Sequence, residues 1–105
     1  FSPIYTEYLG NIAMELIDMG FKGIINAGSP IPCSKYDFGI CLAEEYGLDL
    51  LLIKKGSIAS HLFTAPRVHK LDLNIKKLFD TGISVPKYHN SISQFALNRK
   101  KITDT

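Results

Sequence analysis

The expected fold depends on residues 23–30, which read Gly-Ile-Ile-Asn-Ala-Gly-Ser-Pro. The first five form a short, largely apolar run that predicts a buried strand, and the glycine, serine and proline after them predict a turn. A second run at residues 48–54, Leu-Asp-Leu-Leu-Leu-Ile-Lys, is apolar on both faces in its middle, as strands of buried parallel sheets are. A helical pattern separates the two predicted strands, and this order favours a right-handed parallel crossover.

The clearest helical pattern precedes the first predicted strand. Residues 4–17 place apolar side chains in two neighbouring rows at a spacing of four, which predicts an amphipathic helix. Ser2 and Pro3 suit the beginning of this helix, and Gly20 suits its end.

The second predicted helix lies between the two strands. Ser34 followed by Asp37 resembles a capping box, and the helix is expected to run to about Tyr46 and to end at Gly47. Weaker patterns predict a short helix at 57–63, a helix at 71–80, an extended edge segment at 83–86 and a last helix that opens at Ser91 with Gln94.

Together these elements predict an α/β fold, a small Rossmann-like parallel-sheet domain with helices on both faces. A chain of 105 residues suits one domain spanning 1–105. Two strands are few for a parallel sheet and the first residue is Phe1 rather than Met, so we expect a partial domain from a larger chain.

The composition excludes some partners and favours a compartment. A formal net charge of +2 is too small to predict a nucleic-acid partner. No apolar run approaches the roughly 20 residues of a membrane span, so we expect no membrane partner. Two cysteines are too few for a disulfide scaffold, which fits a reducing, cytoplasmic setting.

A ligand site is expected where the two predicted strands end. In open parallel sheets ligands bind outside the carboxyl ends of the strands, next to helix N-termini, which attract anions. The candidate ligand-binding residues lie in two loops and would face one crevice; they are Gly28, Ser29 and Ser34 in the first, and Lys54, Lys55, Gly56 and Ser57 in the second. In the alternative reading, the lysines end a strand in solvent, Gly56 makes a turn and Ser57 caps a helix.

Two residues are candidates for catalysis, although the sequence assigns neither of them a partner. Cys33 precedes a predicted helix, where the pKa of a thiol tends to fall and its reactivity to rise; it could also fill space in a tight loop. His61 follows the second loop by about one helical turn, and a packed or surface histidine is the alternative. No histidine or cysteine pair has a metal-ligand spacing, so no metal is predicted, and no cofactor is indicated.

Part of the chain resembles two known families. Residues 42–68 contain Leu-Ala-Glu-Glu-Tyr-Gly-Leu, Lys-Lys-Gly and Phe-Thr-Ala-Pro-Arg-Val. This stretch resembles the carboxyl-terminal region of formate dehydrogenase accessory sulfurtransferases, but the paired cysteines of that family are missing. Together with residues 24–32 it is similar to the amino-terminal sensing domain of HPr kinases. Because two unrelated families match equally, neither assigns a family or a catalytic residue.

Two function hypotheses follow from the sequence. The first is a small-molecule-binding domain, enzymatic or regulatory, whose ligand is an anion such as a phosphate, a nucleotide or a carboxylate. The second is an assembly domain whose apolar faces pack in a homo-oligomer or on the rest of a larger chain. The sequence does not decide whether the chain is an enzyme.

Overall fold

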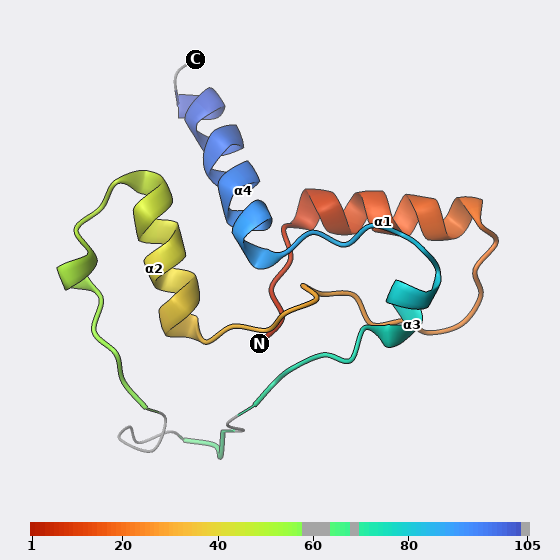
Figure 1. The fold of residues 1–105 in the computed structure, drawn as a ribbon, viewed down its shortest axis with the longest axis horizontal. Helices are drawn as coiled ribbons and strands as arrows, with labels where there is room; N and C mark the ends of the chain where they lie inside the picture. Colours follow the sequence, from red (N-terminus) through yellow and green to blue (C-terminus); the bar gives the residue numbers. More distant parts are fainter. Residues whose placement is uncertain (58–63, 68–69, 104–105) are drawn as a thin grey trace.

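The computed structural model describes residues 1–57, 64–67 and 70–103 (Figure 1). Within this part of the chain all regular structure is helical, and the elements are α1 (Thr6–Asp18), α2 (Lys35–Tyr46), the short 3₁₀-helix η1 (Leu50–Leu52), α3 (Lys76–Asp80) and α4 (Tyr88–Thr103). Figure 1 shows α1 and α3 on one side of the molecule and α2 beside α4 on the other.

The predicted α/β fold is wrong, because the described residues contain no strand and no sheet. Residues 23–27 do not pair with another strand: the carbonyl of Ile24 accepts a hydrogen bond from Lys77 Nζ at 2.7 Å, and Asn26 Nδ2 donates to the carbonyl of Asn74 at 3.4 Å. The segment is therefore held by side-chain hydrogen bonds to α3 and to the residues before it, and not by backbone hydrogen bonds to a paired strand. The described residues therefore do not form a Rossmann-like parallel-sheet domain.

The second predicted strand is also replaced by another structure. Asp49 turns the chain, because its carboxylate accepts a hydrogen bond from the N–H of Leu51 at 2.9 Å and so caps η1. The three leucines of η1 are consequently exposed instead of lying in a sheet. Residues 83–86, expected to form an edge strand, form no strand either.

The first two predicted helices are confirmed. α1 begins three residues later than predicted, and its N-cap is Tyr5 instead of Ser2. The N–H of Tyr5 donates to Ser91 Oγ at 3.2 Å. Past its end Gly20 takes a positive φ of 72°, a conformation that glycine adopts without strain. α2 ends at Gly47 with φ 65°, as predicted.

The later helices differ from their predicted bounds. α3 begins only at Lys76, because Asn74 Oδ1 accepts from the N–H of Lys76 at 3.0 Å and turns the chain there. α4 begins at Tyr88, before the predicted cap at Ser91, whose hydroxyl instead accepts the hydrogen bond from Tyr5. The predicted helix at 57–63 lies, apart from Ser57, outside the described residues.

The core is small and is built around one side chain. Leu78 of α3 is completely buried and contacts Ile12 of α1 and Ile75. The partly buried side chains that pack against this cluster come from the N-terminal segment, α1 and two connecting segments; they are Ile4, Leu16, Ile25, Ala27, Ile83 and Val85. Between α2 and α4 the buried residues are Cys41, Ala43, Ile92 and Ala96.

The molecule is more open than a globular protein of its size. Its radius of gyration is 16.3 Å, whereas a compact domain of this length has about 13 Å. Its accessible surface is 8013 Å² for 11.7 kDa, whereas a folded monomer of that mass exposes about 5,900 Å². The shape is also flat, with extents of 46 × 43 × 22 Å.

Gly28 has little space for an added side chain. A Cβ at this position would lie 2.7 Å from the carbonyl oxygen of Ser2 and 3.2 Å from Leu73 Cδ1. We therefore expect Gly28→Ala to lower the free energy of unfolding by about 1–3 kcal/mol in urea denaturation.

The matched control for Gly28→Ala is Gly10→Ala in α1, where the added methyl group meets no atom within 4 Å. This control should raise the stability by about 0.5–1 kcal/mol, because alanine favours a helix interior over glycine. Equal effects of the two substitutions would contradict the packing around Gly28.

Candidate functional site

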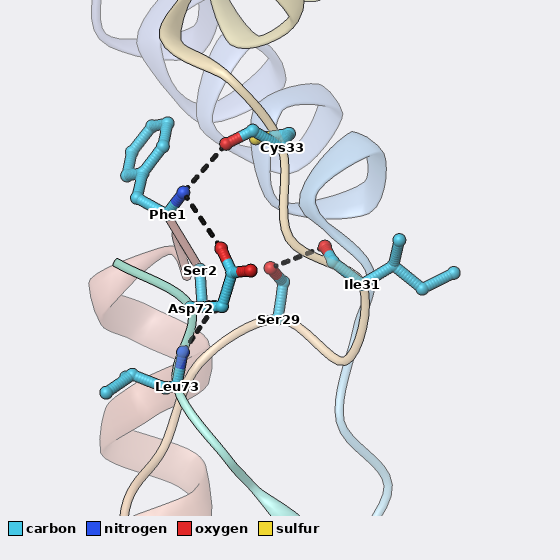
Figure 2. A network of polar contacts seen from close by, with 7 residues as sticks. All are labelled: Phe1, Ser2, Ser29, Ile31, Cys33, Asp72 and Leu73. Carbon is cyan, nitrogen blue, oxygen red and sulfur yellow. Dashed lines mark hydrogen bonds and ion pairs between the residues drawn. The ribbon is translucent and has the colours of Figure 1, made fainter. Parts of the chain in front are cut away.

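The first predicted loop lies in a polar network with the N-terminal residues (Figure 2). The amino group of Phe1 donates to the carbonyl of Cys33 at 2.8 Å and lies 3.7 Å from the carboxylate of Asp72. The N–H of Cys33 in turn donates to the carbonyl of Phe1 at 2.9 Å. Ser2 Oγ accepts from the N–H of Leu73 at 3.1 Å. The network thus joins three segments that are distant in the sequence.

Two of the predicted ligand-binding residues are interior parts of this network. Ser29 is 1% exposed, and its hydroxyl donates to the carbonyl of Ile31 at 3.1 Å. Gly28 is also buried, against Ser2. In this arrangement the two residues shape the loop, and a ligand in solvent does not reach them.

Ser34 lies at the N-terminus of α2 and is engaged as a helix cap. Its hydroxyl oxygen accepts from the N–H of Asp37 at 3.0 Å. This bond is the first half of the predicted capping box. The hydroxyl satisfies one of the N–H groups that a helix N-terminus would otherwise offer to an anion.

The second predicted loop returns to the first turn of α2. A Cβ at Gly39 would lie 3.7 Å from Ile53 Cδ1. Lys55 Nζ lies 5.7 Å from the centre of the Tyr36 ring, within range of a cation–π interaction. Lys54, Gly56 and Ser57 are exposed. The structure therefore brings Lys55 near the first turn of α2, but it does not bring the two loops together at the ends of strands.

The predicted anion site depended on a crevice between strand ends, which residues 1–57, 64–67 and 70–103 do not form. Without strands in the described residues there is no edge at which strand ends and helix N-termini converge. The hypothesis of a Rossmann-like small-molecule site for phosphate, nucleotide or carboxylate is wrong for this reason.

The two cysteines lie in environments that disfavour the thiolate. Burial raises the pKa of the Cys33 thiol above its ordinary value, although the nearby amino group of Phe1 opposes the rise. Burial also raises the pKa of Cys41, with smaller contributions from the carboxylates of Glu45 and Glu44. The predicted lowering at the start of α2 is overcome at Cys33 because that side chain is only 8% exposed.

The other candidate for catalysis is not tested by the structure. His61 lies outside the described residues. Among the residues that are described, no three histidine, cysteine, aspartate or glutamate side chains are close enough to hold a metal ion.

An apolar pocket lies between the segment before α1 and the two helices α2 and α4. Its volume is about 420 Å³, and it is lined by Pro3, Ile4, Tyr5, Thr6, Phe38, Leu42, Ser91, Ile92 and Phe95. Apolar side chains dominate, so the pocket suits an apolar group and supplies no carboxylate, amine or thiol for chemistry. No sequence signal predicted this pocket, because its lining comes from segments that are distant in the sequence.

We expect Cys33 and Cys41 to react with iodoacetamide more slowly than a free cysteine near neutral pH, because a raised pKa leaves less thiolate. The rates should rise as the pH approaches the raised pKa values, and in urea both should equal the rate of a free thiol. Mass spectrometry assigns the two sites; fast labelling of Cys33 in the folded chain would contradict its burial.

The same shifts predict how stability depends on pH. Each thiol has a higher pKa in the folded chain than in the unfolded chain. Its contribution to the free energy of unfolding is therefore fully present below the unfolded pKa. It is lost as the pH rises through the folded pKa.

The described helices include none with the length and apolarity needed to cross a membrane. No protein family, no curated protein and no solved structure matches this chain. The contacts and exposures of the described residues are the grounds on which a function is assigned below.

Proposed function

We propose that this chain is an assembly domain, which packs on another polypeptide surface, in a homo-oligomer or on the rest of a larger protein. The observation that carries the proposal is the exposed surface of 8013 Å², about 2,100 Å² more than a monomer of this mass exposes. A monomer that functions alone would cover more of its apolar surface.

The side chains that make up this surface support the proposal. Large apolar residues are exposed on α1 and the segment after it, on η1, on α3 and the segment before it, and on α4. The most exposed include Ile17 at 68%, Ile24 at 86%, Leu51 at 86%, Leu52 at 77% and Phe79 at 72%. Single exposed apolar side chains are common in folded proteins, but consecutive leucines such as those of η1 are not expected in solvent.

The size of the excess indicates the kind of interface. A standard protein–protein interface buries about 800 Å² on each partner, whereas permanent complexes bury more and are more apolar. An excess of about 2,100 Å² on one chain matches one side of a large, permanent interface. We therefore expect a stable association, not a transient encounter.

The test is the behaviour of the purified chain in solution. We expect it to bind an apolar dye such as anilinonaphthalene sulfonate in its folded state and to unfold at a temperature that depends on protein concentration or on an added partner. Light scattering coupled to gel filtration measures any self-association. A compact monomer that binds no dye and unfolds sharply at every concentration would overturn the proposal.

A matched pair of variants locates the dye-binding surface. Leu51→Glu with Leu52→Glu should reduce dye fluorescence severalfold without loss of helix, because both side chains are exposed. Thr64→Glu, at an exposed polar position, should leave the fluorescence unchanged.

A further inference from the structure

The apolar part of α1 is wider than one packing face requires. Successive residues of a helix are rotated by about 100°, so the side chains between Tyr8 and Met14 on the helix circumference span an arc of about 240°. Within this arc Thr6, the first residue of α1, is the one polar residue, and all the others are apolar. A helix that packs on one side needs an apolar arc of about 100°. The sequence of α1 therefore provides for two contacts on different sides.

Within the described part of the chain, only one of these sides is covered. Ile12 is 3% exposed and packs on Leu78, and Leu16 packs beside it. This row is the inner face of α1. Tyr8, at the edge of the inner face, is half-buried and stacks edge-on against Tyr5 at 5.9 Å.

The other side is an apolar surface that we call the outer face. It consists of Leu9, Gly10, Ala13, Met14 and Ile17, which lie in two adjacent rows at a spacing of four. All five are exposed, Met14 to 58% and Ile17 to 68%. A Cβ at Gly10 would meet no atom within 4 Å, so the middle of this face is open and shallow.

Acidic residues border the outer face and no basic residue lies on α1. Glu7 and Asp18 follow Met14 around the helix, at about 20° and 40° from it. Glu7 Oε2 accepts a hydrogen bond from Asn98 Nδ2 at 3.0 Å, and in the described part of the chain neither carboxylate forms an ion pair. The outer face thus has an apolar centre and a negative border.

We propose that the outer face of α1 binds an amphipathic helix of a partner protein, with lysine or arginine beside its apolar side; this inference rests on the proposed assembly function. Small residues between larger ones allow a second helix to approach and to place its side chains in the groove between the rows. Cations on the partner meet Glu7 and Asp18, and this complementarity favours the correct partner and orientation.

The same charges argue against a second copy of α1 as the occupant. Two copies of this helix would bring their acidic borders together without a basic residue on either side, and like charges at an interface are unfavourable. Self-association of the chain would then use another part of its exposed surface.

The test uses two synthetic helical peptides of about 20 residues. Both carry leucine on one face; one has lysine beside it and its twin has glutamate. In titrations of the full isotope-labelled chain, we expect the lysine peptide to bind with micromolar affinity and to shift the amide signals of residues 9–17. The glutamate twin should bind at least tenfold more weakly.

Two variants and a matched control locate the site. Ile17→Gln should weaken binding of the lysine peptide about tenfold, as truncation of an interface anchor does. Ile24→Gln, the same change at an exposed isoleucine outside α1, should have no effect. Glu7→Gln with Asp18→Asn should abolish the preference for lysine over glutamate and keeps the test valid if Ile17→Gln loses helix.

Four results would overturn this inference. They are equal affinity for both peptides, binding unaffected by Ile17→Gln in a folded chain, no binding at millimolar peptide, or shifts of residues 9–17 that depend on the concentration of the chain itself. The last result would assign the outer face to a second copy. A chain that binds the apolar dye but not the lysine peptide would refute only this inference and leave the assembly function standing.

Discussion

The described structure depends on the burial of Leu78, because α1, α3 and two connecting segments pack together around this side chain. α1 contributes Ile12 to the cluster around Leu78. Ile25, from the segment between α1 and α2, and Ile83, from the segment after α3, pack against that cluster. α3 has five residues, far fewer than an isolated helix needs to be stable in water. It persists because complete burial of its leucine contributes about 1.5–3 kcal/mol, and because the positions of α1 and both neighbouring segments are set against it.

This core is too small to stabilise a chain of 105 residues by itself. A surface of 8013 Å² means that folding buries roughly half of the area exposed by the unfolded chain, less than even a 60-residue domain buries. Ordering the backbone costs about 1–2 kcal/mol per residue, and apolar burial is the main term that offsets it. The contact of α2 with α4 adds a second cluster but leaves η1 uncovered. Too little apolar area is buried on folding because many large apolar side chains stay exposed.

The sequence predicted the helices better than the rest because their signals are local. Rows at a spacing of four, the cap at Ser34 and the glycines at 20 and 47 act within one or two turns, and α1 and α2 form where they were expected. A strand needs a neighbour, and an apolar run such as residues 48–54 does not specify one. Here the carboxylate of Asp49 accepts a hydrogen bond from the N–H of Leu51, and residues 50–52 form a 3₁₀-helix. The predicted crevice required the sheet, and the structure instead places Gly28 and Ser29 in a packed loop and Ser34 at a helix cap.

The two faces of α1 link folding to assembly. Its inner face reaches Leu78 through Ile12, while its outer face lies on the same rigid helix and is open to solvent. A partner that binds the outer face only when the helix is formed stabilises the folded state by mass action. That stabilisation extends through Ile12 to α3 and its neighbouring segments, which have little other support. Docking at α1 thus requires no rearrangement of the core. The exposed apolar surface lowers the stability of the isolated chain, and its burial by a partner raises that stability.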